Sequence, residues 1–268
     1  MCVGTAAGTY AHTGAAYAGP MQTWNAEVVQ YHRLRNDLAV IRLVGDVIPF
    51  AAGQSLEVTV PQNARLTRRY SPALPPSLDG KLEFHVRAVP AGWVSGSIVN
   101  ETRPGDVWKL TDPKGTLAVD DSGRDVVMIA GGTGLAPMRS LILDLAHRAT
   151  TPPSVTLYVG GRSPRDLYAA DLLWILASEL PWLTVVPVVD QLKDPWAPDR
   201  WNDTIRAETA EVPIFGPEHC WEGSLADVMS VQEPFRDHQV LVCGSPGMEA
   251  ATISALIGNG TPAAAIRR

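Results

Sequence analysis

The 268-residue sequence is short of cysteine, of long apolar runs and of basic clusters. Its three cysteines, Cys2, Cys220 and Cys243, lie far apart, so they predict neither a disulfide framework nor a metal site and favour a reducing, cytoplasmic compartment. No uninterrupted apolar segment reaches the length of a membrane span. The net charge of −6 and the lack of a long basic run give no support to nucleic-acid binding.

The composition that remains is that of a globular protein, with 46% hydrophobic and 19% charged residues. A length of 268 residues favours two domains of ordinary size. The first 21 residues are rich in Ala, Gly, Thr and Tyr, and they lack both the basic start and the continuous apolar stretch of a signal peptide. We expect residues 1–21 to be a flexible tail or the remnant of a linker.

Residues 22–121 read as short strands separated by turn residues. The predicted strands cover residues 25–32, 38–44, 55–60, 81–88 and 107–110. Turn residues such as Pro49, Gly53, Pro61 and Gly80 separate them, with little helical periodicity between. This pattern predicts a small antiparallel β-barrel.

Residues 122–268 alternate between strand and helix. Apolar strands are predicted at 126–130, 155–159, 183–189 and 239–243, with helices at 137–147, at 166–180 and after Pro246. Such alternation predicts a doubly wound parallel sheet, and therefore a two-domain β plus α/β protein. Residues 190–219, with Trp196 and Trp201, show no clear period and are expected to be loop and short elements.

The segment Arg68-Arg69-Tyr70-Ser71-Pro72 combines a cation, an aromatic ring and a hydroxyl. In an extended chain Arg68 and Tyr70 project to one face, and Pro72 keeps Ser71 extended. A guanidinium suits a diphosphate and a phenol ring suits a flat heterocycle. Taken alone, the segment fits equally well a strand edge with exposed arginines and a packed tyrosine.

Three further segments suit a bound nucleotide. Gly132, Thr133, Gly134 and Pro137 occupy a strand-to-helix turn, where close backbone approach and a helix N-terminus favour a pyrophosphate. The segment from Gly92 to Ser95 offers backbone amides and a hydroxyl, although Ser95 also suits a plain helix N-cap. Cys243, Gly244 and Met248 follow the last predicted strand, and a lone cysteine there is usually a buried structural thiol.

The order of these four segments resembles the ferredoxin–NADP reductase superfamily, from about Trp24 to the C-terminus. Residues 82–95 are most similar to reductase domains of flavohaemoglobins and bacterial oxygenase systems. The resemblance implies an FAD-binding barrel and an NAD(P)-binding α/β domain. It also implies FAD contacts by Arg68, Tyr70, Ser71, Pro72, His85, Val86, Arg87, Gly92, Val94 and Ser95, and NAD(P)H contacts by Gly132, Thr133, Gly134, Pro137, Arg162, Cys243, Gly244 and Met248.

The implied function is transfer of a hydride from NAD(P)H to FAD and of electrons to a separate globin or iron–sulfur protein. Ser71 and Cys243 are the candidate catalytic residues, acting through orientation and electrostatics. Arg162 suits the 2′-phosphate of NADPH, but similar segments occur in NADH-using relatives, and NADH is slightly favoured. The alternatives are an NAD(P)H diaphorase or free-flavin reductase, and a non-catalytic electron-transfer subunit. Many relatives end in a residue that covers the flavin or nicotinamide, whereas this sequence ends at Arg268; an open flavin face or a shortened end is expected.

Overall fold

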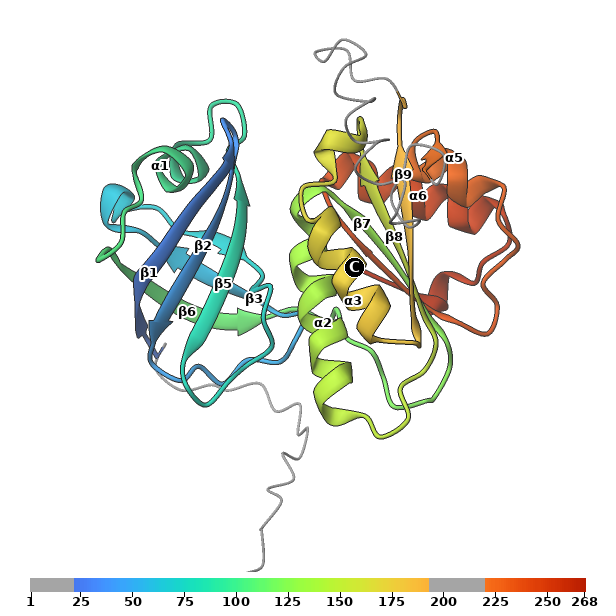
Figure 1. Cartoon of the computed structure of the whole chain (residues 1–268), viewed down its shortest axis with the longest axis horizontal. Helices are drawn as coiled ribbons and strands as arrows, with labels where there is room; N and C mark the ends of the chain where they lie inside the picture. The colour runs from blue at the N-terminus through green and yellow to red at the C-terminus, as the bar shows by residue number, and fades with distance from the viewer. Residues whose placement is uncertain (1–21, 193–219) are drawn as a thin grey trace, which may run out of the picture.

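The computed structural model describes residues 22–192 and 220–268. The predicted tail at 1–21, and most of the predicted loop at 190–219 with Trp196 and Trp201, lie outside these residues. The described chain forms a lobe of antiparallel strands and then a lobe of parallel strands with helices, side by side (Figure 1). The predicted fold class is confirmed.

The first lobe is a six-stranded antiparallel sheet. Its strands are β1 (Trp24–Arg35), β2 (Leu38–Gly45), β3 (Ser55–Thr59), β4 (Arg68–Tyr70), β5 (Lys81–Arg87) and β6 (Val107–Lys114), in the order β4-β3-β6-β1-β2-β5. Alternating inward side chains build its core, in which the rings of Phe84 and Trp108 lie 5.9 Å apart. The short turn η1 (Pro61–Asn63) joins β3 to β4, and α1 (Trp93–Glu101) follows β5 and adds Val94 and Ile98 to the core.

Pro72 closes this sheet into a barrel. It follows β4, at one edge of the sheet, and pairs with Phe84 on β5, at the other edge. The next residue, Ala73, donates its N–H to the carbonyl of Glu83 at 2.7 Å. Proline lacks an N–H, so it suits a position where strand pairing ends. The closure leaves no long open edge on either strand.

The second lobe is a six-stranded parallel sheet. Its strands are β7 (Val126–Gly131), β8 (Val155–Gly161), β9 (Leu183–Val189), β10 (Trp221–Glu222), β11 (Gln239–Cys243) and β12 (Ile266–Arg267), in the order β10-β9-β8-β7-β11-β12. The connecting elements are η2 (Gly132–Gly134), α2 (Leu135–Arg148), η3 (Pro164–Asp166), α3 (Ala170–Glu179), α5 (Leu225–Ser230), α6 (Pro246–Gly258) and η5 (Ala263–Ala265).

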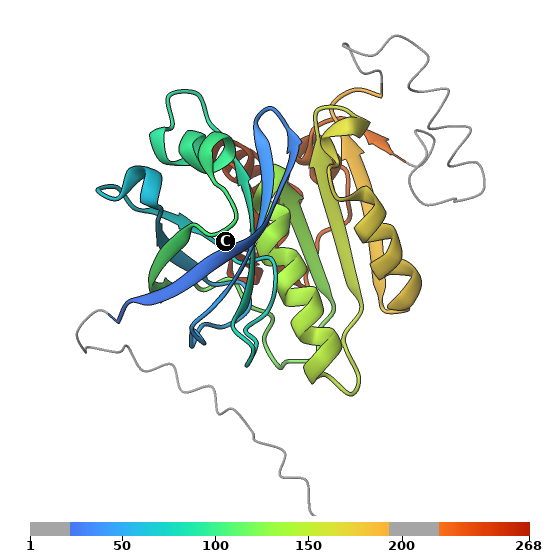
Figure 2. The same ribbon diagram turned by 60° about the vertical axis from the view of Figure 1, so that its left-hand side comes forward.

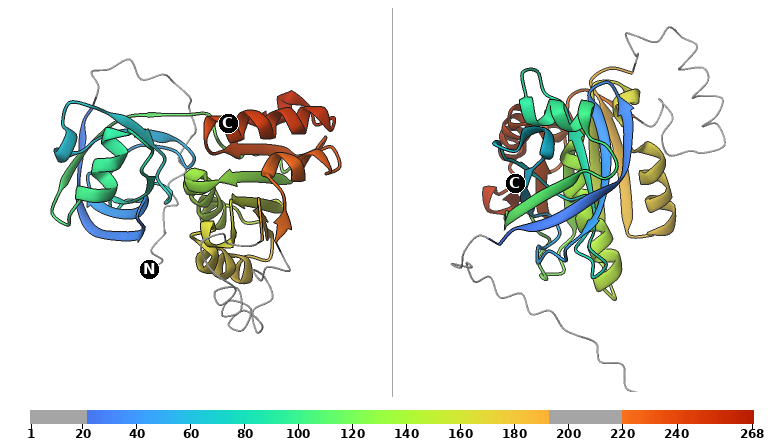
Figure 3. Two further views of the ribbon diagram at one scale, coloured as in Figure 1. Left: turned by 90° about the horizontal axis from the view of Figure 1, so that it is seen from above. Right: turned by 90° about the vertical axis from the view of Figure 1, so that its left-hand side faces the viewer.

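Helices cover both faces of the parallel sheet. Seen from above, α2 and α3 lie on one side and α5 and α6 on the other (Figure 3). Along β7, Val126, Met128 and Ala130 pack on the α2–α3 side, whereas Val127 and Ile129 pack on the α5–α6 side. A strand covered on both faces reads as the continuous apolar run seen in the sequence.

The start of α3 differs from the prediction, which placed a helix at 166–180. Pro164–Asp166 forms a 3-10 turn in which Asp166 completes a capping box with Ser163, and α3 begins only at Ala170. Leu167 has ψ of 63°, which is not helical. The short elements β10, α5 and β12 were not predicted.

The linker between the lobes runs from Gly115 to Asp125 and contains the predicted domain boundary at residues 121 and 122. Leu117 and Val119 pack into the α2–α3 side of the second core. The N–H of Asp120 donates to Gln239 at 2.7 Å, and Arg267 Nη2 lies 2.6 Å from the Asp120 carboxylate. The later part of the linker is therefore attached to the parallel sheet, next to the C-terminus.

Gly134 is required where the turn after β7 meets the end of β11. A Cβ atom at Gly134 would lie 2.1 Å from the carbonyl oxygen of Cys243, and backbone cannot yield as a flexible side chain can. We expect Gly134→Ala to lower the free energy of unfolding by about 1–3 kcal/mol in denaturant titrations. Gly247→Ala is the matched control: nothing lies within 4 Å of that Cβ, so its stability should be unchanged or higher. A Gly134→Ala protein as stable as the control would contradict the packing argument.

Candidate functional site

A cavity of about 760 Å³ lies between the two lobes. The barrel contributes β4, the end of β5 and the start of α1, and the other lobe contributes the loops after β7, β8, β9 and β11. The cavity brings together many of the sequence-predicted residues, namely Arg68, Tyr70, Arg87, Gly92, Val94, Ser95, Gly132, Thr133, Arg162, Gly244 and Met248. A volume of this size is ordinary for a cofactor site.

The strand order explains why the cavity lies at this edge of the parallel sheet. β7 lies between β8 and β11, so the chain leaves β7 to one side and later returns to the other. Loops at the carboxyl ends of such strands diverge and form a crevice. The loop after β7 carries Gly132 and Thr133, and the loop after β11 carries Gly244 and Ser245.

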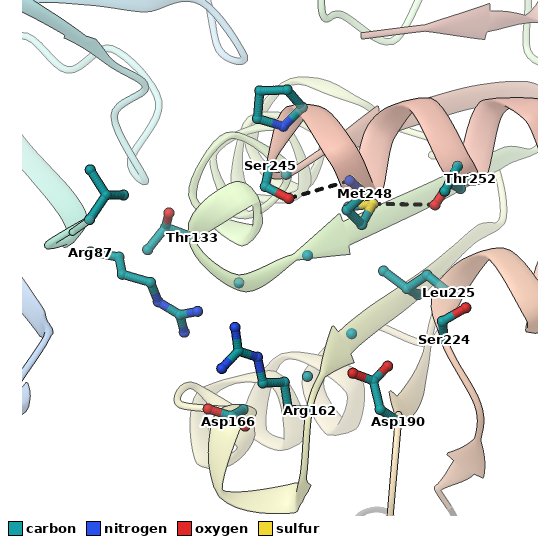
Figure 4. Close-up of a pocket in the computed structure, with 18 of the residues that line it drawn as sticks. Arg87, Thr133, Arg162, Asp166, Asp190, Ser224, Leu225, Ser245, Met248 and Thr252 are labelled. Carbon is teal, nitrogen blue, oxygen red and sulfur yellow. Dashed lines mark hydrogen bonds between the residues drawn. The ribbon is translucent and has the colours of Figure 1, made fainter. Parts of the chain in front are cut away.

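These two loops pack closely around Met248. A Cβ on Gly131 would lie 2.6 Å from Met248 Cε, and one on Gly244 would lie 2.3 Å from the same atom. The Met248 sulfur accepts a hydrogen bond from Thr252 at 3.3 Å (Figure 4). The close packing leaves no room for a side chain at Gly131 or Gly244, both of which line the cavity. Helix α2 continues directly from η2 without a side-chain cap, and the N–H of Leu135 donates to the carbonyls of Gly132 and Thr133.

The two neighbouring arginines on β4 have different surroundings. Arg69 pairs with Asp112 at 3.0 Å and with Glu57 at 3.6 Å. Arg68 has no carboxylate partner among the described residues, and its Nη1 donates only to the Thr67 carbonyl at 2.7 Å. Tyr70 is half-buried, and burial raises its pKa to about 12 against the opposing charge of Arg68, so its ring carries a neutral hydroxyl. Arg68 and Tyr70 therefore remain available to a ligand.

Arg87 extends from the barrel to the loop after β7. Its guanidinium lies 3.6–3.8 Å from the position of a Cβ on Gly132, whose φ is +55°. Its Nε and Nη2 atoms are buried without a hydrogen-bond partner, and its nearest carboxylate, Asp37, lies 3.8 Å away. Arg162 points towards Arg87 across the cavity (Figure 4). Two facing guanidinium groups with unused donors fit an anionic group such as a diphosphate.

Ser95 supports a loop from within. Its hydroxyl accepts the N–H of Val89 at 3.2 Å and donates to the carbonyl of Gly92 at 3.3 Å. The N-cap of α1 is Gly92, so the alternative prediction that Ser95 is the N-cap is wrong. Ser95 instead lies in the first turn of α1 and ties it to the end of β5.

Seven predicted site residues do not line the cavity: Ser71, Pro72, His85, Val86, Gly134, Pro137 and Cys243. Pro72 closes the barrel, Val86 lies in its core, and Pro137 is buried in the first turn of α2. Both ring nitrogens of His85 are engaged, by Glu83 at 3.0 Å and by Tyr168 at 2.7 Å.

The thiol of Cys243 is not activated. It is partly buried against the core, and burial together with the charge of Glu249 raises its pKa to about 12. A thiol with such a pKa stays protonated near neutrality and is a poor nucleophile. Any role of Cys243 must therefore come from its position, because β11 ends at this residue and Gly244 begins the loop that lines the cavity.

Sequence reasoning missed the acidic residues at the end of the cavity. Asp190 follows β9 and Asp166 follows β8, and both line the cavity beside Arg162 (Figure 4). Asp166 is paired with Arg35; burial disfavours its charged form, but Arg35 lowers its pKa overall. No carboxylate–cation pair within the described chain involves Asp190. Its place directly after a buried parallel strand was the signal available in the sequence.

Within residues 22–192 and 220–268, no helix is long and apolar enough to cross a membrane. The same residues hold no group of three or more His, Cys, Asp or Glu side chains suited to a metal ion.

Comparison with known proteins agrees with the two-lobed arrangement. Residues 25–119 match the oxidoreductase FAD-binding domain, and residues 128–253 match the oxidoreductase NAD-binding domain. The reductase component of phenol 2-monooxygenase from Pseudomonas sp. strain CF600 is 38% identical over 148 residues, which are 55% of this chain and 41% of that protein. Reductase component 1 of terephthalate 1,2-dioxygenase from Comamonas sp. is 32% identical over 217 residues, which are 79% of this chain and 57% of that protein.

Solved structures with the same two-domain arrangement are also similar to this chain. The ferredoxin reductase in carbazole 1,9a-dioxygenase superposes with a TM-score of 0.74 at 26% identity, over 94% of this chain and 70% of its own. The flavohaemoglobin-like FAD/NAD-binding domain of nitric oxide dioxygenase from Vibrio cholerae has the same fold, with a TM-score of 0.70 at 19% identity, over 91% of this chain and 96% of its own. This chain spans about half the length of the first curated relatives that it matches. It belongs to the ferredoxin–NADP reductase superfamily, with an FAD-binding domain followed by an NAD-binding domain.

Proposed function

We propose that this chain is the reductase of an oxygenase system, taking a hydride from NADH and passing electrons to a separate redox protein. The observation that carries the proposal is that Arg68 and Tyr70 of the FAD-binding domain line the same cavity as the glycine loops of the NAD-binding domain. The two bound cofactors supply the redox chemistry, and the protein supplies their placement.

The barrel side of the cavity fits FAD. Arg68 has unused donors for a diphosphate, and Tyr70 offers a neutral aromatic face two residues further along the same strand. The loop from Val89 to Ser95 presents backbone next to them, and the Ser95 hydroxyl fixes its shape. Ser71 and Pro72 follow β4 directly, and the pairing of Pro72 with Phe84 would hold the chain in place beside Tyr70.

The opposite side fits a nicotinamide dinucleotide. Gly132, Thr133 and the start of α2 would hold its diphosphate, with Arg87 and Arg162 neutralising the charge. Gly244 and Met248 would border the nicotinamide. Cys243 would act by fixing the start of this loop.

Asp190 favours NADH over NADPH. A carboxylate at this edge of the sheet accepts hydrogen bonds from ribose hydroxyls and repels a 2′-phosphate. Arg162 lies on the same side of the cavity and would attract a 2′-phosphate, but its side chain extends towards Arg87, where an anionic diphosphate between the two guanidinium groups would offset their mutual repulsion (Figure 4). This arrangement supports the preference for NADH expected from the sequence.

The proposed acceptor is an iron–sulfur or oxygenase protein. Several of the similar proteins are reductase components of monooxygenases and dioxygenases, and one is named a ferredoxin–NAD(P)+ reductase component of a naphthalene dioxygenase system. A globin acceptor remains the second possibility, on the likeness to flavohaemoglobin reductase domains alone. We keep the cytoplasm as the proposed compartment, on the scarcity and wide spacing of cysteine.

The direct test is to reconstitute the purified protein with FAD and follow the flavin absorbance after adding NADH. Bleaching under anaerobic conditions is expected. Reoxidation is then compared with a [2Fe–2S] ferredoxin, a globin, free flavin and a dye as acceptors. Reoxidation fastest with the ferredoxin supports the proposal, and reduction of free flavin alone identifies a diaphorase instead.

Arg68→Ala should weaken FAD binding about 10- to 100-fold, because one charge-assisted contact to a phosphate contributes about 1.5–3 kcal/mol. Equilibrium dialysis of FAD against the apoprotein measures this change. Arg65→Ala is the matched control, an exposed arginine three residues before Arg68, in the segment between η1 and β4, that does not line the cavity. Equal affinity in the two variants would remove Arg68 from the FAD site.

Asp190→Asn should raise the ratio of kcat/KM for NADPH to that for NADH about tenfold, equivalent to ~1.4 kcal/mol of removed repulsion. Glu179→Gln, which neutralises an exposed carboxylate at the end of α3, is the control and should leave the ratio unchanged. If both variants shift the ratio equally, the effect is one of overall charge and Asp190 is not the discriminating residue.

A further inference from the structure

The outer face of β5 is polar although it is buried. Leu82, Phe84 and Val86 point into the barrel core, so Glu83 and His85 must point outwards. Glu83 is 3% exposed and His85 6%, because the NAD-binding domain covers them. Figure 2 shows α2 of that domain passing directly beside the barrel.

Glu83 gathers donors from both domains. From the barrel, Arg42 Nε lies at 2.6 Å and His85 Nε2 at 3.0 Å. From α2, Arg139 Nη1 donates to the same carboxylate and also approaches the carbonyl of Ala73 at 3.4 Å. Burial disfavours the charge on Glu83, but the hydrogen bond from His85 and the positive charge of Arg139 outweigh it and lower its pKa to about 2. The carboxylate is therefore ionised at neutral pH.

His85 carries the connection back to the NAD-binding domain. Burial lowers its pKa despite the neighbouring carboxylate, so the ring is neutral at physiological pH. A neutral ring that donates Nε2–H to Glu83 must accept at Nδ1, and the Tyr168 hydroxyl is the donor there, at 2.7 Å. The two rings also meet edge to face, with centroids 5.5 Å apart. Burial raises the pKa of Tyr168, which keeps this proton in place.

Arg139, Glu83, His85 and Tyr168 thus form one hydrogen-bonded chain, here named the interdomain clamp. It starts on α2, passes through two barrel residues, and ends after η3. The clamp lies close in sequence to the cavity residues: His85 precedes Arg87 by two, Tyr168 follows Asp166 by two, and α2, which carries Arg139, begins two residues after Thr133. No member lines the cavity itself.

We propose that the interdomain clamp positions the nicotinamide site against the flavin site, with Tyr168 and Arg139 as positioning residues for hydride transfer. The proposal rests on the function proposed above. An apolar contact would tolerate sliding between the domains, whereas a buried ion needs its partners in one arrangement. Displacing reacting groups by about 1 Å can cost on the order of 100-fold in rate. The clamp therefore acts on the rate of the reaction rather than on cofactor binding.

The test uses Tyr168→Phe, which removes one interdomain hydrogen bond while keeping charge and packing. The matched control is Tyr158→Phe, because the Tyr158 hydroxyl bonds Gln232 at 3.4 Å within one domain. For the FAD-loaded full chain, stopped-flow absorbance gives the rate of flavin reduction at saturating NADH, and titration with NAD+ gives its Kd.

Tyr168→Phe should reduce flavin about 3- to 10-fold more slowly, since one neutral hydrogen bond changes an equilibrium by about that factor. FAD content and the Kd of NAD+ should stay within twofold of the control. The long-wavelength charge-transfer absorbance of the reduced enzyme with NAD+ should weaken, as it reports ring overlap. Arg139→Gln should give the same pattern more strongly, and Arg139→Lys should recover part of the rate.

A Tyr168→Phe enzyme as fast as Tyr158→Phe overturns the proposal. So does a loss of rate that runs in parallel with weaker NAD+ or FAD binding, because that would place Tyr168 in the binding site. If the parent protein shows no flavin reduction, the proposed function fails. Hydrogen exchange then tests whether the interdomain clamp holds the two domains together. If it does, the amides of β5 and α2 must exchange faster in Tyr168→Phe than in the control.

Discussion

Strand β5 packs on one face against the barrel core and on the other face against the NAD-binding domain. The rest of the structure depends on this double contact. Its inward residues complete the barrel core, while its outward residues are covered by a second domain. A buried outer face of a barrel strand would ordinarily be apolar. Here it carries a carboxylate and an imidazole, whose hydrogen bonds depend on residues 56 and 83 positions away in the sequence.

The sequence predicted most of the architecture because the relevant signals are local. The apolar run of β7 and the alternation in the barrel strands follow from which faces are covered, and turn glycines mark where strands end. The start of α3 was missed because a capping box normally opens a helix, whereas Ser163 and Asp166 cap a single 3-10 turn. Asp166 is also paired with Arg35 of the barrel, which no local pattern reveals.

In the candidate site, too, the sequence predicted the residues that belong to local motifs and missed those whose role depends on contacts in the folded chain. Arg68, Gly132 and Met248 were found from motif order, and they line one cavity. The motif could not separate Arg68 from Arg69; only the folded chain shows that Arg69 is paired with Asp112 and Glu57. Asp190 and the partners of His85 escaped prediction because their role depends on strand order and on contacts between domains. Charges of both signs line the cavity: Arg87 and Arg162 extend towards each other, and Asp166 and Asp190 lie on either side of Arg162 (Figure 4).

The attachment of Asp120 to Gln239 and Arg267 bears on how far the domains can separate. Because Leu117 already packs into the second core, only Gly115 and Thr116 lie between the end of β6 and residues held by the other domain. The three Cα–Cα steps from Lys114 to Leu117 reach about 10 Å when fully extended. The domains are thus tethered almost in contact, and each site meets the other at the high local concentration of an intramolecular encounter, whatever the concentration of the protein.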